Sequence, residues 1–288
     1  MTISRLFPAI TLLLVTSVAP ACAQQGANIN QNAALRYWSA FAEMQDSAIT
    51  DEQTKELNQT LDGVTPYDDL KYRDLLAQNQ RALDTMVRAN SLPSCEWGLD
   101  YQLGSEAPVD YVRKGLALGR LNVLYAYHLS LTGDKDGAAR ALAAGLRFSH
   151  DLANGGSLFA AVVAKDLIVT HLRVVAFESR TGGLSTRQKM LLQNAVTQLG
   201  PAGLDWQSSI RQEFEGHHGP DSKPPVELTP IVPAYLRALD DASLLPRLQK
   251  LIASAPQTIQ DIVPYPKRVL AEKEDLGDWV LKTRSLLQ

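Results

Sequence analysis

The densest group of side chains that could do chemistry lies over residues 213–221. It holds Glu213, Glu215, His217, His218 and Asp221. Imidazole and carboxylate groups at such spacing are ligands for zinc and other divalent metals. The region lacks the HExxH spacing of a helical zinc site, and adjacent histidines in a loop are often only solvated. Despite these counterarguments, the types of side chain present make Glu213, His217, His218 and Asp221 the candidate ligands of a divalent metal. No other cofactor is predicted.

Three further histidines fall one on each of three successive predicted helices: His128, His150 and His171. In an antiparallel stack, His128 lies near the end of its helix and His150 near the end of the next, which places the two at opposite poles. A rise of about 1.5 Å per residue then separates them by roughly 25 Å. We therefore expect packed or surface histidines here rather than a shared metal site.

Cys95 and the adjacent Glu96 offer a nucleophile without a base nearby in the sequence. A distant histidine could complete a thiol site in the fold. Free cysteines are among the most buried residues, so we expect a packed, inert thiol. The sequence contains no Gly-x-Ser-x-Gly elbow, phosphate-binding loop or dinucleotide fingerprint.

Aromatic residues gather in the N-terminal half of the chain: Tyr37, Trp38, Trp97, Tyr101, Tyr111, Tyr125 and Tyr127. Such rings could line a groove for a peptide or a sugar, and Trp97, Tyr101 and Tyr111 are the candidate groove residues. Filling of the core is the default interpretation for large rings.

The elements that would position these residues are helices. From residue 30 to the C-terminus apolar residues recur every three to four positions, and no segment favours a strand. Helix start signals stand at Asp134, Ser157 and Ser185, the last with Gln188 as a capping box. In a helix over residues 108–132, apolar side chains would occupy almost every face, which predicts that this helix is central in the fold. The fold class is thus all-α, an irregular antiparallel, solenoid-like stack of helical hairpins without a sheet.

The first 23 residues have the pattern of a signal peptide. Arg5 precedes an apolar run over residues 9–19, and Ala21-Cys22-Ala23 suits cleavage before Gln24. A lipid anchor on Cys22 is the alternative, which the preceding residues Ala19 and Pro20 disfavour. We expect an exported protein, periplasmic or secreted.

The remaining chain divides into a main helical domain over 24–215, a proline-rich loop over 216–233 and C-terminal helices over 234–288 that pack on the same domain. The most apolar helix, over 158–177, is interrupted by Lys165, Asp166, His171 and Arg173, so it predicts a core helix rather than a membrane span. No membrane-spanning segment is expected after signal removal. The net charge is -3 and no basic stripe appears, which argues against a nucleic-acid partner.

Two resemblances add to this picture. Leu121–Leu152 resembles one tetratricopeptide-type hairpin, in which Gly133-Asp134 makes the turn and small residues such as Ala138 and Ala139 allow close approach. The segment with Cys95, Trp97, Asp100, Tyr101 and Gly104, together with the opening over residues 32–41, looks like a group of exported bacterial all-helical proteins without an assigned activity. This likeness covers about residues 32–180 and implies a shared fold, and it carries over no catalytic residue.

Stacked helical hairpins present concave surfaces, and nothing in the sequence demands catalysis. We therefore expect a non-catalytic interaction or binding module of the bacterial cell envelope, with a protein or peptide as partner. The alternative is a metal-dependent hydrolase that uses the Glu213–Asp221 region.

Overall fold

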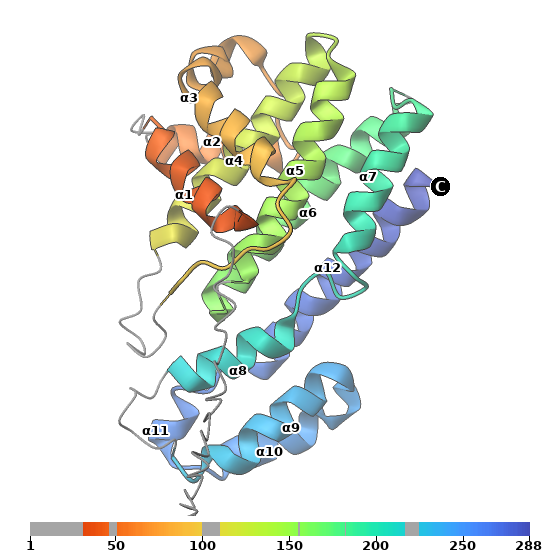
Figure 1. Ribbon diagram of the computed structural model, residues 1–288. Helices are drawn as coiled ribbons and strands as arrows, with labels where there is room; N and C mark the ends of the chain where they lie inside the picture. The colour runs from red at the N-terminus through yellow and green to blue at the C-terminus, as the bar shows by residue number, and fades with distance from the viewer. Residues whose placement is uncertain (1–30, 46–50, 100–109, 155, 182, 217–224) are drawn as a thin grey trace, which may run out of the picture.

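The computed structural model describes residues 31–45, 51–99, 110–154, 156–181, 183–216 and 225–288. Within these ranges the chain forms twelve α-helices and one short 3-10 helix, and the only strand-like pairing is an isolated parallel bridge between Asn32 and Ser94. The predicted all-α fold is therefore confirmed (Figure 1).

The first six helices form one packed group (Figure 1). Their bounds are α1 Ala33–Glu43, α2 Asp51–Leu61, α3 Asp69–Ala89, α4 Asp110–Leu131, α5 Lys135–Ala153 and α6 Leu158–Arg180. Short turns connect α4 to α5 and α5 to α6, and each of these pairs packs along its length. The hairpin expected over Leu121–Leu152 is thus present, while its likeness to a tetratricopeptide unit stays a prediction.

The second half of the chain adds the helices α7 Thr186–Gln198, α8 Trp206–Gly216, α9 Leu228–Asp240, the 3-10 helix η3 Ala242–Leu244, α10 Leu245–Ala253, α11 Gln257–Gln260 and α12 Pro266–Leu287. Figure 1 shows α8 to α11 at one end of the molecule and α12 running back from them toward the first group. There α12 packs against α6 and α7. The last helix therefore ties the two ends of the molecule together.

Helix boundaries follow local capping. Asp134 accepts a hydrogen bond from the Gly137 N–H, and Ser157 accepts one from the Ala160 N–H. Ser185 and Gln188 form the predicted capping box at the start of α7. Each cap satisfies an amide at the first turn that has no partner within the helix. These predicted start signals are confirmed.

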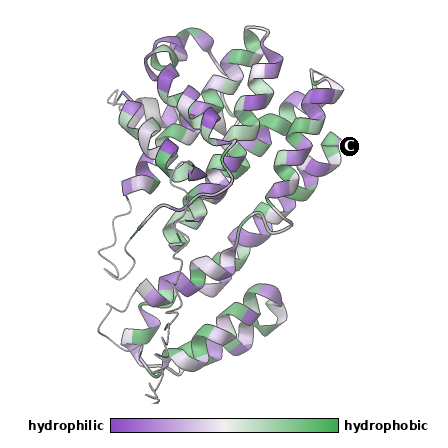
Figure 2. Cartoon of the chain, viewed as in Figure 1, coloured by the Kyte–Doolittle hydropathy of each residue, from purple (hydrophilic) through white to green (hydrophobic). Residues whose placement is uncertain are grey.

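The most enclosed helix is α5 rather than α4. Of the 19 residues of α5, 14 are buried, against 11 of the 22 in α4. Figure 2 shows hydrophobic and hydrophilic residues alternating along the helices, and on α4 the apolar Leu131 is exposed. Small residues such as Ala141 and Gly145 let α5 approach α4 and α6 at once, so close packing, more than apolar side chains all round, decides which helix is central.

One predicted boundary was wrong. The proline-rich loop does not extend to residue 233, because α9 begins at Leu228 and contains Pro230 and Pro233. A proline in the first turn of a helix removes no hydrogen bond, and the carbonyl that Pro233 leaves without a partner belongs to the exposed Thr229, where water can bind it. Helix α3 begins at Asp69, and the side chain of Asp68 caps it. In the described part of the chain, no helix combines the length and apolar character needed to cross a bilayer.

Candidate functional site

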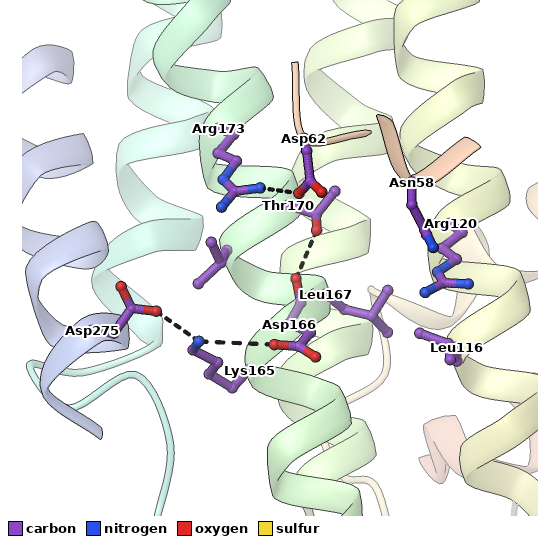
Figure 3. Close-up of a pocket in the computed structure, with 11 residues that line it drawn as sticks. Asn58, Asp62, Leu116, Arg120, Lys165, Asp166, Leu167, Thr170, Arg173 and Asp275 are labelled. Atoms are coloured by element: carbon purple, nitrogen blue, oxygen red, sulfur yellow. Dashed lines mark hydrogen bonds and ion pairs between the residues drawn. The ribbon is translucent and has the colours of Figure 1, made fainter. Parts of the chain in front are cut away.

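A hollow of about 300 Å³ opens where α2, α4, α6 and α12 meet (Figure 3). We call it the polar hollow. Three cationic and three anionic side chains line it, namely Arg120, Lys165, Arg173, Asp62, Asp166 and Asp275. The apolar side chains of Leu116 and Leu167 lie between them. A concave site with a few converging polar groups is the usual form of a small-molecule site.

Helix α6 supplies one wall through its periodicity. Asp166, Thr170 and Arg173 are separated by steps of four and three residues, which place side chains on one helical face, and Lys165 directly precedes Asp166 at the side of that face toward α12. Figure 3 shows them arranged along α6, with Arg173 two turns beyond Asp166. The opposite wall comes from α4, where Arg120 follows Leu116 by one turn. The rigid α4–α5–α6 packing therefore sets the width of the hollow.

Lys165 ties α6 to α12. Its Nζ lies 2.6 Å from Asp275 Oδ2 and 2.9 Å from Glu272 Oε2, and its side chain is only 11% exposed. Burial by itself would lower the pKa of Lys165, but the hydrogen bonds and charges of Asp275 and Glu272 outweigh burial and raise that pKa above its ordinary value. The ammonium is thus charged and its donors are engaged.

Arg173 is engaged as well. Its Nη1 lies 2.5 Å from Asp62 Oδ1, in the turn that follows α2. The same guanidinium stands 5.5 Å from the centre of the Trp279 ring on α12, a cation–π contact. Arg173 therefore joins α6 both to the end of α2 and to α12.

Arg120 differs from these two cations. Its guanidinium makes no hydrogen bond or ion pair with any residue that the structure describes, although it is half-buried. Burial lowers the pKa of Arg120, and the longer-range charges of Asp166 and Asp62 act in the opposite direction. A guanidinium carries five donors, and in Arg120 none of them is engaged by a residue whose position the structure describes.

Asp166 is the corresponding anion. Within the described ranges its carboxylate accepts no hydrogen bond, and its nearest cation is Lys165 Nζ at 3.8 Å. A distance of 3.8 Å is too long for a hydrogen bond. The ammonium of Lys165 instead donates to Glu272 and Asp275 on α12. The side chain is 66% exposed and lines the hollow beside Leu167 (Figure 3). Among the described residues, Arg120 thus has no hydrogen bond or ion pair, while Asp166 on the facing helix has only the 3.8 Å ion pair with Lys165 and accepts no hydrogen bond.

The predicted metal ligands are only partly described. Glu213 lies on α8, where its Oε2 accepts a hydrogen bond of 3.1 Å from the Leu158 N–H at the start of α6. This contact caps α6, a structural role. His217, His218 and Asp221 lie outside the described residues. Among the residues with described positions, no three of histidine, cysteine, aspartate or glutamate come together as a metal site, and the metal site stays a prediction.

The candidate groove residues Trp97 and Tyr111 are placed in the core. Their exposed fractions are 6% and 1%, and their ring centres are 4.8 Å apart. The Trp97 indole N–H donates to the backbone carbonyl of Asp151 at 2.8 Å. These positions match core filling, the default interpretation, and lend the groove no support. Tyr101 lies outside the described ranges, so a groove that includes it stays a prediction.

The three spaced histidines occupy separate environments. The fully buried His171 donates from Nδ1 to the Leu167 carbonyl at 2.7 Å, and its Nε2 accepts from the Asn122 amide at 3.1 Å. His128 lies 2.6 Å from Asp69 on α3. His150 is half-buried, and burial lowers its pKa. Packed and surface histidines were predicted, and these contacts agree with that.

Cys95 is a packed thiol. It is half-buried, and its Sγ lies 3.9 Å from the Asp151 carbonyl. Burial, together with the nearby Asp151 carboxylate, raises the pKa of the Cys95 thiol well above its ordinary value. The thiol stays protonated at neutral pH, which is the state of an inert packed cysteine.

The polar hollow was not predicted, although its signal is present in the sequence. Lys165, Asp166 and Arg173 interrupt the most apolar helix, a pattern that argues against a membrane span and also marks a polar surface on a core helix. Charged residues on a helix that is otherwise buried need partners or a ligand. What the sequence does not show is that Arg120, 46 positions earlier than Asp166, faces the same space.

The chain was compared with known protein families, with curated proteins and with solved structures, and none of them matches. The resemblance to a group of exported helical proteins therefore stays a prediction. Inferences about function rest on the geometry of the polar hollow.

Proposed function

We propose that the protein is a binding module of the bacterial cell envelope and that the polar hollow is its ligand site. The observation that carries the proposal is the half-buried guanidinium of Arg120, which faces the hollow without a partner among the described residues. A desolvated cation without a partner is costly, and a bound ligand would supply the missing acceptor.

The construction of the walls supports a binding role. Ion pairs of Lys165 and Arg173 hold α6 against α12 and against the end of α2. The hollow is therefore bounded by helices whose relative positions are already set, so little conformational entropy would be lost on binding. The polar groups that line it are six charged side chains, the amide of Asn58 and the hydroxyl of Thr170, and such groups orient a polar solute.

Export is part of the proposal and rests on the sequence pattern of residues 1–23. A binding module with a cleaved signal peptide would meet small solutes of the envelope. Intact mass measurement of the protein recovered from the periplasm tests this part. We expect a chain that begins at Gln24, and a chain that retains residues 1–23 in the cytosol contradicts it.

The ligand site can be tested by saturation-transfer NMR on the full exported chain. The probes are L-alanine, D-glucose, methyl phosphate and putrescine at millimolar concentration, all of which carry the non-exchangeable protons that the method detects. Leu116→Trp fills the hollow, because Leu116 lines it. Leu131→Trp is the matched control on the same helix, since Leu131 is exposed at the far end of α4 and does not line the hollow.

We expect at least one probe to receive saturation from the wild type and from Leu131→Trp but not from Leu116→Trp. Circular dichroism confirms that both variants are folded. The proposal is contradicted when no probe binds, or when binding is the same in the two variants.

A further inference from the structure

The charged groups that line the polar hollow differ in how far other side chains already engage them. Lys165 is bonded to Asp275 and Glu272, and Arg173 is bonded to Asp62. These internal pairs satisfy four of the six charged groups that line the hollow. Only Arg120 and Asp166 are left without a hydrogen bond to their charged groups from the residues described.

The two remaining groups are complementary in charge and lie on facing helices. Arg120 comes from α4 and Asp166 from α6 (Figure 3). They influence each other electrostatically, yet they do not form a direct ion pair. A ligand that bridges them must carry an anionic group for the guanidinium and a cationic group for the carboxylate.

Resting on the proposed function, we infer that the polar hollow binds a zwitterion with a carboxylate and an ammonium group close together, as in a free amino acid. The planar guanidinium of Arg120 matches a carboxylate through two parallel hydrogen bonds. The Asp166 carboxylate accepts from the ammonium. Leu116 and Leu167 lie beside these groups and would contact the carbon atoms of the ligand.

Size and charge favour this class over others. A volume of about 300 Å³ is at the lower end for small-molecule sites, which suits a ligand of amino-acid size. A phosphate would meet the guanidinium of Arg120 but also the carboxylates of Asp62 and Asp166, which repel it. A polyamine would be repelled by the guanidinium of Arg120.

The test uses the full exported chain and titrates L-alanine and L-glutamine against their methyl esters and N-acetyl derivatives, with binding followed by saturation-transfer NMR. The ester removes the carboxylate charge and the acetyl group removes the ammonium. We expect each zwitterion to bind about tenfold or more tightly than either derivative, because one charged hydrogen-bonding group is lost in each.

Variants assign the two ends of the ligand. Arg120→Gln removes the preference for the zwitterion over its methyl ester, and Asp166→Asn removes the preference over the N-acetyl form. Arg113→Gln on α4 and Asp278→Asn on α12 are matched controls, because both residues are exposed and do not line the hollow. Both controls keep the full preference. Thermal unfolding verifies that all four variants are folded.

The inference is overturned when esters or N-acetyl derivatives bind as tightly as the parent zwitterions, or when Arg120→Gln leaves the preference intact. Glucose or methyl phosphate binding that Leu116→Trp abolishes, without amino-acid binding, also overturns it while the proposed ligand site stands. When no probe responds to Leu116→Trp, the proposed function itself fails.

Discussion

His171 should make the stability of this protein depend on pH between 4 and 6.5. Its ring is fully buried among α4, α5 and α6 and bonded to the Leu167 carbonyl and the Asn122 amide. Burial lowers the pKa of His171 from 6.5 to about 4, although the Leu167 carbonyl acts in the opposite direction. The native ring is therefore neutral under conditions in which an exposed histidine is charged.

The sign follows from proton binding. Between pH 6.5 and 4 the unfolded chain binds a proton at His171 and the folded chain does not, so acid favours unfolding. The contribution is complete above pH 6.5 and is lost as the pH falls toward 4. Each unit of pKa shift corresponds to about 1.4 kcal/mol, so the shift at His171 amounts to about 3 kcal/mol.

Urea unfolding followed by circular dichroism from pH 4 to pH 7.5 measures the contribution of His171 to the free energy of unfolding, when the wild type is compared with His171→Gln. Other titrating groups, including Asp151, are common to both proteins, so their contributions cancel in the difference between the two free energies of unfolding. We expect the difference in free energy of unfolding to change by about 3 kcal/mol between pH 7 and pH 4. Leu172→Ala, at a buried position beside His171, should lower stability by the same amount at every pH. Parallel pH profiles for wild type and His171→Gln would refute the reasoning.

Three further predictions concern packing, ion pairs and caps, and thermal or urea unfolding checks each. Gly145→Ala should destabilise the protein by about 1–3 kcal/mol, because the added Cβ would overlap buried polar side chains of α4 and α6. Gly277→Ala should leave stability unchanged or raise it by up to about 1 kcal/mol. Equal effects of the two substitutions would contradict this prediction. Lys165→Met should lower the free energy of unfolding by about 1–3 kcal/mol. Arg81→Met should lower it less, because the Arg81 side chain is 83% exposed in its ion pair with Glu43, and a larger effect of Arg81→Met would contradict this prediction. Ser185→Ala should cost about 1 kcal/mol by removing a cap, and an unchanged midpoint would count against the capping role.

Helix positions were largely predictable because the interactions that start a helix are local. Ser185 and Gln188 are three positions apart, so both partners of the capping box are visible in the sequence. The same holds for Asp134 and Gly137. The prolines of α9 were misjudged because their cost depends on whether water reaches the carbonyl of Thr229, which is a matter of tertiary exposure.

The buried polar groups were less predictable. Gly145 has no side chain to attract attention, yet it leaves room for His171 and Asn122 between α4, α5 and α6. In the sequence His171 looks like any histidine on an apolar helix. Its lowered pKa arises from complete burial, which depends on how three helices pack.

The polar hollow also combines features that the sequence determines with features that only the tertiary structure decides. Apolar periodicity and capping residues in the sequence determined that the chain is helical and where most helices begin, since those signals act within four residues along one helix. Only the tertiary structure decided that Lys165 and Arg173 are satisfied by distant helices. It also decided that Arg120 and Asp166 face one space in which, among the described residues, neither charged group makes a hydrogen bond. The rotation of each helix about its axis and the crossing of its neighbours set these pairings, and both result from close packing of side chains far apart in the sequence.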